Sequence, residues 1–195
     1  MFILDASNDI DVLRKFDTHF SHGHIVRCMV TAIDSERGSV DLSLKAAEYL
    51  DSIGDDASKK IKSKALKQLL GTAQVGSVCL GRVESVSANG MFYNVQIASH
   101  EWARLSFFEL ADSLPANPGK HYSQKQIVKC RVLEEGKKHC VISTRDSKVD
   151  EDGDADVVDP CINSIKELEE LDTVRGYVMN ASVRPVCVVV CPCCP

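Results

Sequence analysis

The sequence predicts an all-β protein made of five-stranded antiparallel barrels in tandem. One observation is a recurrence: residues 24–30 (HIVRCMV) return as residues 126–132 (QIVKCRV). Each copy is followed by a turn and a second strand-like segment that ends in Lys45 or Arg145. In both copies apolar residues alternate with a period of two, as in a half-buried strand. Such self-similarity marks a repeated supersecondary unit, here of about seventy residues.

The first strand of the complete unit is expected over residues 75–86. Its alternation places Cys79, Gly81 and Val83 on one face. Asn89-Gly90 is a strong tight-turn signal, which predicts a hairpin between this strand and the next.

The second strand is expected over residues 91–97 and a short third strand over residues 101–105. Residues 106–123 lose the alternation and contain prolines and glycine, which predicts a long loop with one helical turn at residues 108–112. Tyr93 shares its parity with apolar neighbours and is expected in the core.

The last two strands are expected over residues 125–133 and 138–145, joined by a turn at residues 134–137. Five short strands with a long connection between the third and the fourth fit the Greek-key barrel called the OB-fold. Closure removes the exposed edges that an open sheet of this size would leave.

These units predict a division of the chain. Residues 1–47 form the C-terminal part of a truncated barrel and residues 48–71 a basic linker, helical around residues 57–70. Residues 72–147 form a complete barrel and residues 148–168 an acidic linker, and residues 169–195 begin a further truncated unit. The chain is therefore expected to be a piece of a longer array.

The N-terminal copy keeps the alternation, so Val26, Cys28 and Val30 are expected to point inward. Without three strands of its own, however, this half-barrel should be weakly ordered or should borrow an edge from a neighbour. Residues 186–195 contain four crowded cysteines and depart from the repeat, with Pro185 and Pro192 opposing a regular strand. We expect no function from them.

The charge distribution and the cysteine positions limit the class of protein. The net charge is −5, but residues 72–145 carry nine Lys or Arg against six Asp or Glu, whereas residues 146–170 carry two against ten. The barrel is therefore basic and its linker acidic. The chain shows no signal peptide or membrane-spanning run, which predicts a reducing compartment. Four cysteines fall on apolar strand parities and are expected as buried thiols: Cys28, Cys79, Cys130 and Cys140.

Several segments together resemble the S1 RNA-binding domain: residues 75–83, residues 89–92, residues 105–110 and residues 126–132. Residues 40–45 and 173–180 are similar to the last and the opening strand of further repeats. Among tandem S1 proteins the chain resembles most the ribosomal RNA processing protein 5 family. That resemblance implies a nucleolar scaffold in ribosome biogenesis, which contacts pre-ribosomal RNA and other assembly proteins.

OB-fold barrels bind single-stranded RNA by stacking bases on aromatic rings beside a positive groove. The resemblance places the usual stacking positions at Asn89, Phe92 and Ser106, where only Phe92 keeps a ring. Arg104 shares the parity of Ser106 and can stack on a base or pair with a phosphate. On the fourth strand, Lys125, Lys129 and Arg131 are expected to face outward. The alternative for all of these is an ordinary solvated face.

Other signals are set aside. Trp102, beside Phe107 and Phe108, is expected to plug the barrel end, with a protein-contact surface as the alternative. His19, His22 and His24 with Cys28 match no zinc spacing, so no metal is expected.

The sequence shows no phosphate-binding loop or nucleophile with a spaced base, which predicts a protein that is not an enzyme and has no cofactor or small-molecule substrate. A protein-interaction scaffold and a translation-related S1 protein remain alternatives.

Overall fold

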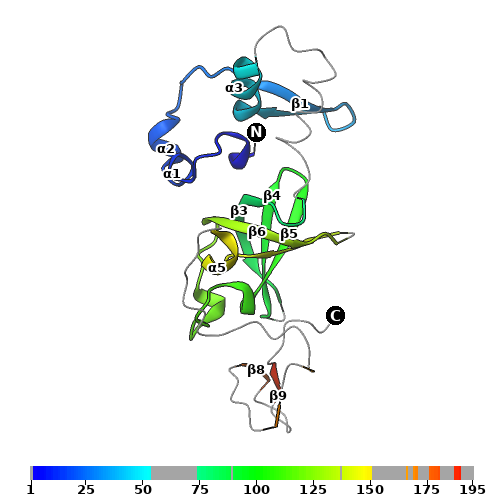
Figure 1. Ribbon diagram of the computed structural model, residues 1–195. Coiled ribbons are helices and arrows are strands. Elements are labelled where there is room, and N and C mark those ends of the chain that lie inside the picture. The colour runs from blue at the N-terminus through cyan, green and yellow to red at the C-terminus, as the bar shows by residue number, and fades with distance from the viewer. Residues whose placement is uncertain are drawn as a thin grey trace.

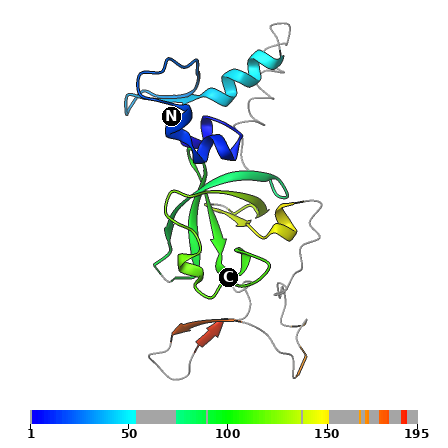
Figure 2. The same cartoon turned by 90° about the vertical axis from the view of Figure 1, so that its left-hand side faces the viewer.

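The computed structural model describes residues 2–53, 74–88, 90–136, 138–150, 166, 169–170, 176–180 and 187–189. Three parts follow one another in space, and two perpendicular views agree on their order (Figures 1 and 2). Residues 2–53, hereafter the N-terminal part, lie at one end of a central β-barrel. A short hairpin of β8 (Tyr177–Asn180) and β9 (Cys187–Val189) lies beyond the other end.

The central barrel has five strands and is closed. Around the barrel the strands follow the order β3-β4-β5-β7-β6, and β6 pairs again with β3. This is the predicted OB-fold, with strand bounds within a few residues of those expected. The strands are β3 (Val78–Val86), β4 (Phe92–Ala98), β5 (Glu101–Ser106), β6 (Ile127–Glu134) and β7 (Cys140–Ser143).

The prediction of a wholly antiparallel barrel was wrong in one pair. β5 and β7 run parallel, with Ala103 opposite Cys140 and Leu105 opposite Ile142. The long connection from β5 to β6 explains this, because it carries the chain around the barrel before the tight β6–β7 turn reverses it. β7 therefore arrives beside β5 pointing the same way. Among the described residues only this one barrel is closed, and the tandem arrangement stays a prediction.

The barrel core contains the inward-facing residues that the alternation predicted. Tyr93 is 1% exposed, and its hydroxyl donates a hydrogen bond to the carbonyl of Pro118 at 2.5 Å. At Gly81 a Cβ atom would lie 2.6 Å from Cγ1 of Val95, so glycine permits the close approach of β3 to the core. The core side chains are those of Val83, Tyr93, Val95, Ile97, Ala103, Leu105, Phe107, Leu110, Val128, Cys130, Val132, Cys140 and Ile142.

The four cysteines expected as buried thiols are free thiols, but only two are buried. Cys130 and Cys140 lie in the barrel core. Cys79 and Cys28 are partly exposed, because Cys79 is near the start of β3 and Cys28 precedes a hairpin that no barrel encloses. The expectation of burial was therefore too broad for these two.

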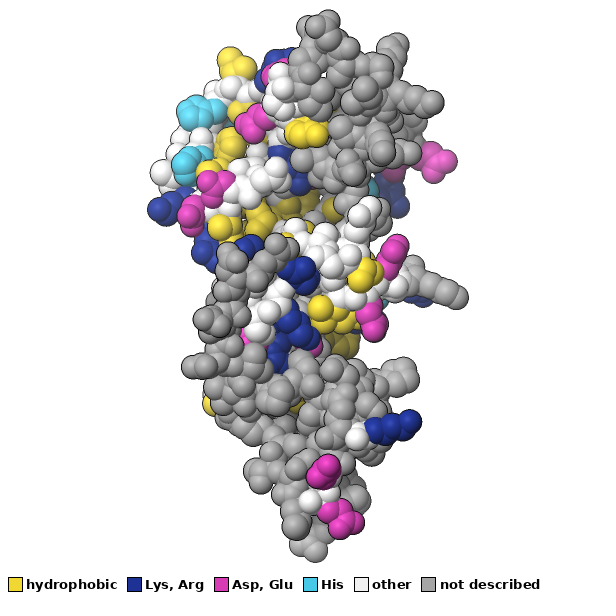
Figure 3. Space-filling model, in the orientation of Figure 1, with side chains coloured by type: hydrophobic (Ala, Val, Ile, Leu, Met, Phe, Trp, Pro, Cys, Tyr) yellow, Lys and Arg dark blue, Asp and Glu magenta, His cyan; other side chains and the backbone are white. Residues whose placement is uncertain are grey.

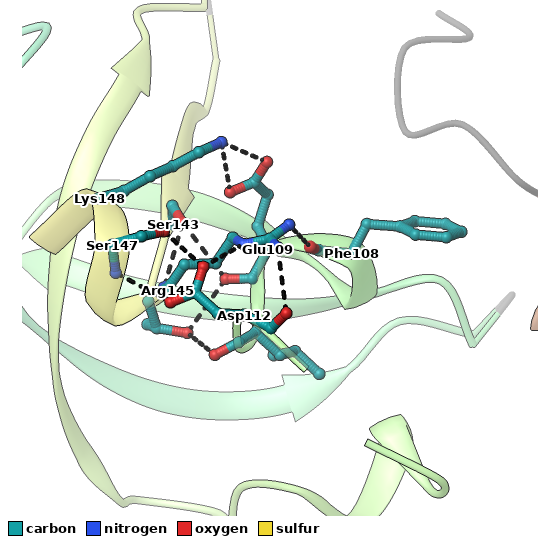
Figure 4. Close-up of polar contacts among 9 residues, drawn as sticks. Phe108, Glu109, Asp112, Ser143, Arg145, Ser147 and Lys148 are labelled. Atoms are coloured by element: carbon teal, nitrogen blue, oxygen red, sulfur yellow. Dashed lines mark hydrogen bonds and ion pairs between the residues drawn. The ribbon is translucent and has the colours of Figure 1, made fainter. Parts of the chain in front are cut away.

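A buried polar cluster fixes the long β5–β6 connection to the residues that follow β7 (Figure 4). This connection contains the 3-10 helices η2 (Phe107–Glu109) and η3 (Pro118–Lys120). Nε of Arg145 lies 3.0 Å from the Asp112 carboxylate, and Arg145 also donates to the carbonyl of Phe108. Lys148, in the short helix α5 (Asp146–Val149), donates to Glu109 at 2.8 Å.

Arg145 and Asp112 form the least exposed ion pair of this cluster, with side chains 2% and 9% exposed. Burial acts to raise the pKa of Asp112, but hydrogen bonds from Ser147 and Arg145 outweigh it and hold that pKa below the ordinary aspartate value. The carboxylate therefore stays ionised and anchors the connection.

The N-terminal part repeats the element order of residues 107–150: a 3-10 helix, a loop with helical turns, a hairpin and a helix. Its apolar cluster joins Leu4, Ala6, Leu13 and Leu44 to Ile127 of β6, with Leu80 of β3 packed against it. This part therefore packs on the outer face of the barrel. Its elements are η1 (Ile3–Asp5), α1 (Ile10–Arg14), α2 (Phe16–His19), β1 (Met29–Asp34), β2 (Ser39–Ser43) and α3 (Leu44–Ile53).

The inward positions expected on the first strand of the N-terminal copy are not buried. Val26 is 45% exposed and Val30 is 52% exposed, while Cys28 is partly buried. On the next strand the same alternation predicts Val40, Leu42 and Leu44 inward, and of these Leu44 is buried, at 5% exposed. Within the described residues β1 and β2 form a sheet of two strands, so their apolar face is not enclosed as in the barrel. The alternation predicted the strands correctly, but it could not supply the partner that buries them.

Several expectations lie outside the described residues: the basic helix at residues 57–70, the acidic run at residues 151–165 and the turn residue Asn89. At the end of the chain the structure corrects one expectation. A short strand, β9, forms between the two prolines and pairs antiparallel with β8. A three-residue strand is short enough to fit between Pro185 and Pro192.

Candidate nucleic-acid interface

The outer face of β4 and β5 carries the main group of predicted RNA-binding residues. In the antiparallel register Phe92 lies opposite Ser106, Asn94 opposite Arg104, and Gln96 opposite Trp102. The intervening residues of both strands are buried in the core, so these six side chains share the outward face. The sequence parity that grouped Arg104 with Ser106 is confirmed.

Phe92 and Arg104 contact each other on this face. The guanidinium carbon of Arg104 lies 4.8 Å from the centroid of the Phe92 ring, within the range of a cation–π interaction. Phe92 is half-buried, whereas Arg104 is exposed. The contact places the planar cation over the aromatic ring, so the pair offers a guanidinium plane on which a base can stack and a positive charge that can meet a phosphate.

Ser106 lies next to Phe92, but its hydroxyl already has a local role. Its oxygen accepts a hydrogen bond from the backbone N–H of Phe108 at 3.4 Å and so caps η2. Ser106 therefore offers a small polar surface beside the Phe92 ring rather than a platform for stacking.

Two neighbours that the sequence argument missed complete the polar part of the face. Asn94 donates to the hydroxyl of Ser85 on β3 at 3.0 Å, and Gln96 donates to the carbonyl of Ser99 at 2.9 Å. Both follow Phe92 at intervals of two residues, so the alternation that placed Phe92 outward could have identified them.

The cations of β6 lie on a different side of the barrel. β3 separates β6 from β4, and β7 separates β6 from β5. Nζ of Lys129 lies 2.6 Å from Asp150, with both side chains about half exposed. Arg131 donates to the backbone carbonyls of Gly76, at 2.8 Å, and Lys148. The structure thus does not bring Lys129 and Arg131 beside Phe92.

Lys125 belongs to the turn that precedes β6. It adopts a φ of 67°, and its backbone N–H donates to the carbonyl of Val83 at 2.6 Å. Its side chain is exposed. That hydrogen bond offsets the backbone strain of a non-glycine residue at this φ. The ammonium group of Lys125 lies in solvent.

Charges of both signs lie on the face that Figure 3 shows. There the visible Lys and Arg side chains gather in small groups, with hydrophobic and acidic side chains among them (Figure 3).

The expectation that Trp102 plugs the barrel end was wrong. Phe107 and Phe108 are buried, each 5% exposed, but Trp102 is 40% exposed on the outer face of β5. The sequence prediction grouped Trp102 with Phe107 and Phe108 because all three are aromatic and close in sequence. In the structure β5 ends at Ser106, and the chain turns there into η2. That turn sends the two phenylalanines inward and leaves Trp102 outside.

Two further features bear on the class of site. Within the described ranges no three His, Cys, Asp or Glu side chains come together as a metal site would require. The helices of the described part are too short and too polar to cross a membrane.

The closed five-stranded barrel defines this protein as an OB-fold protein with an N-terminal part packed against the barrel. Its sequence resembles proteins named Protein RRP5 homolog, as the motifs predicted. It is 26% identical over 183 residues to the one from Homo sapiens and 30% identical over 176 residues to the one from Mus musculus. The matches cover 94% and 90% of this chain, which spans only 8% of the length of each relative.

No protein-family model matches the chain. Among solved structures it is similar to an a/eIF2alpha–aDim2p–rRNA complex from Pyrococcus horikoshii, with a TM-score of 0.35 and 17% identity over 38% of this chain and 45% of the other. It is also similar to GSP13 from Bacillus subtilis, with a TM-score of 0.36 and 20% identity over 44% of this chain and 65% of the other.

Proposed function

We propose that this chain is a non-catalytic RNA-binding segment of an RRP5-like ribosomal RNA processing protein. Its barrel binds single-stranded RNA through the outer face of β4 and β5. The observation that carries this proposal is the contact between Arg104 and Phe92 on an exposed sheet face. A guanidinium packed over an aromatic ring meets the two needs of a single strand, a stacking surface and a counter-charge.

The wider role follows from the likeness to RRP5 homologues. We place the chain in ribosome biogenesis in the nucleolus, with pre-ribosomal RNA and other assembly proteins as partners and no membrane or small-molecule substrate. Residues 72–147 serve as one barrel of a tandem array, flanked by truncated units at residues 1–47 and 169–195. Linking several weak barrels raises the overall affinity through effective concentration.

The predicted residues divide between two roles. Phe92 and Arg104 form the stacking face, with Ser106 as a polar neighbour, and Asn89, outside the described residues, is assigned to the same face from the sequence alone. Lys125, Lys129 and Arg131 add electrostatic attraction from other sides of the barrel. Because Phe92 is the only ring left at the usual stacking positions, the affinity of this barrel alone is expected to be modest, in the micromolar range.

The test is fluorescence anisotropy of the whole chain with unstructured single-stranded RNA across a salt series, with duplex RNA as control. Phe92→Ala should weaken binding by about 1–3 kcal/mol, the cost of one lost stacking platform. The control is Tyr49→Ala, since Tyr49 is an exposed aromatic residue on α3, outside the face of β4 and β5. Equal affinity of the Phe92→Ala variant and the unaltered chain would remove this site assignment.

The cations are tested by the salt slope. Replacing Lys129 and Arg131 together by alanine should reduce the slope of log affinity against log salt by up to about 1.4, at about 0.7 for each phosphate contact with a single strand. Arg131 also holds the carbonyls of Gly76 and Lys148, so circular dichroism must show that the variant is folded. An unchanged slope would confine these residues to a structural role.

A second candidate function is protein contact, and the β1–β2 hairpin favours it. This hairpin exposes Val30, Ile33 and Val40 by 52%, 69% and 46%. Exposed apolar strands are typical of surfaces that pair with another chain. If the chain shows no RNA binding even at low salt, this scaffold role replaces the RNA-binding one.

A further inference from the structure

The single tryptophan of the chain lies in line with the proposed RNA-binding residues. Trp102 faces outward from β5, opposite Gln96 and two residues before Arg104. It is 40% exposed and belongs to neither apolar cluster of the described residues. A large indole left half in solvent on a barrel face is not explained by packing, because burying it elsewhere would stabilise the fold.

The register gives the spacing of the row. Phe92 lies opposite Ser106, which is four residues from Trp102 along β5. At about 3.3 Å per residue the two rings are separated by about 13 Å along the strand. The backbone of Arg104 lies midway, and its guanidinium reaches over the Phe92 ring. One sheet face thus presents an aromatic ring with a guanidinium at one end and an indole at the other, and bases can stack on surfaces of these kinds.

One exposed lysine comes shortly before β7, the strand beside β5. β7 runs parallel to β5, and Ala103 lies opposite Cys140. Lys138 comes two residues before Cys140 and is exposed. Glu101 comes directly before Trp102 in β5, so charges of both signs belong to this end of the row.

Carboxylates mark where the row ends. In the β4–β5 turn the Ser99 hydroxyl donates to Asp5 at 2.9 Å, and Nε2 of His100 lies 3.0 Å from Asp41. These contacts bring two acidic residues of the N-terminal part to the barrel just beyond Trp102. Acidic groups repel phosphates, so an RNA strand that follows the row has its last favourable contact at Trp102.

We propose that Trp102 stacks a base of the single-stranded RNA that Phe92 and Arg104 bind, and so extends the binding row along β5. This inference rests on the function proposed above. It specifies a single-stranded ligand that occupies the whole row, at the lower end of the roughly 4–16 nucleotides that one OB-fold holds. A duplex does not fit, because its bases already stack on one another.

The experiment uses the intrinsic fluorescence of the whole chain, which reports on Trp102 alone. Titration with single-stranded oligouridine of about ten nucleotides should quench the emission, with the same midpoint as anisotropy of the labelled oligonucleotide. Trp102→Ala should weaken binding at least about fivefold, whereas Trp102→Phe, which keeps a ring, should stay within about twofold. Because the side chain is exposed, both variants should keep the circular dichroism spectrum of the unaltered chain.

The outcomes separate the two proposals. If anisotropy shows binding that Phe92→Ala weakens, while the Trp102 emission does not change and Trp102→Ala binds normally, the role of Trp102 is overturned and the RNA-binding function stands. If the unaltered chain binds no single strand at low salt, both fail. Equal quenching by duplex RNA would overturn the stacking assignment.

Discussion

The β1–β2 hairpin and the β6–β7 hairpin arise from matching sequence but lie in different surroundings. Val30 and Val132 hold the same place in the repeat, yet Val30 is 52% exposed and Val132 is 1% exposed. β6 and β7 close a barrel with three further strands, whereas β1 and β2 form a sheet of two. Alternation therefore determines which side chains share a face, and partner strands determine whether that face is buried.

The two regions are alike in their local contacts. The hydroxyl of Ser43 donates to the carbonyl of Asp5 at 3.1 Å, and the hydroxyl of Ser143 donates to the carbonyl of Glu109 at 3.4 Å. In both regions the end of the second strand is thus tied to the 3-10 helix that precedes the hairpin by many residues. These ties need no barrel, which explains why they persist in the N-terminal part.

The largest expected difference is between Arg145 and Lys45, the residues that end the two copies. Arg145→Ala should destabilise the barrel by about 3–5 kcal/mol, because it leaves the Asp112 carboxylate buried without its partner. Lys45→Ala should cost less, because Lys45 and Asp5 are 4.0 Å apart and more exposed, at 16% and 13%, and burial lowers the pKa of Lys45 against the attraction of Asp5.

Urea denaturation followed by far-UV circular dichroism measures both variants. Arg145→Lys is the matched control, because it keeps the charge and loses the several hydrogen bonds of the guanidinium to Phe108 and Asp112. Its loss should fall between the other two. Equal losses of stability for Arg145→Ala and Lys45→Ala would contradict this prediction, because they would show that the two ion pairs contribute alike.

Arg145 also shows where prediction from sequence ends. The alternation predicted all five strands, the barrel and the core position of Tyr93. It could not predict that Arg145 is 2% exposed, because its partner Asp112 lies 33 residues away in a loop without periodicity. For the same reason the alternation led to Phe92 and Lys129 being predicted as parts of one RNA-binding surface. Parity gives the face of one strand, but it does not give which strands lie on the same side of a closed barrel.

The two valines test the burial difference directly. Val132→Ala should destabilise by about 2 kcal/mol, from lost apolar burial and the cavity it leaves. Val30→Ala should stay within about 0.5 kcal/mol, as is usual for an exposed site. Chemical denaturation of both variants, with an identical change of side chain in each, isolates the surroundings as the variable.

Similar losses for the two valines would have one clear meaning. Val30 would then be buried in solution by a partner that covers the β1–β2 face, for instance a second copy of this chain. A dependence of the Val30→Ala effect on protein concentration would identify that case, because association adds stability by mass action.

The smallest expected difference appears in acid. Because the pKa of Asp112 is lowered by Ser147 and Arg145 against the effect of burial, its ionised form contributes stability above the ordinary aspartate value of 3.8. That contribution is lost as the pH falls through the lowered pKa of the folded state. The Asp112→Asn variant should therefore be less stable than the unaltered chain at neutral pH. The difference in stability between the two should become smaller in acid.

Thermal denaturation from pH about 7 to about 2 measures this gap, with Asp34→Asn in the β1–β2 turn as control. Asp34 is accessible and accepts hydrogen bonds from the backbone of Glu36 and Arg37, which an asparagine oxygen can also accept. The control should follow the unaltered chain at every pH. A gap for Asp112→Asn that stays constant into acid would mean that its cost comes from altered packing, and that the carboxylate charge does not hold the β5–β6 connection.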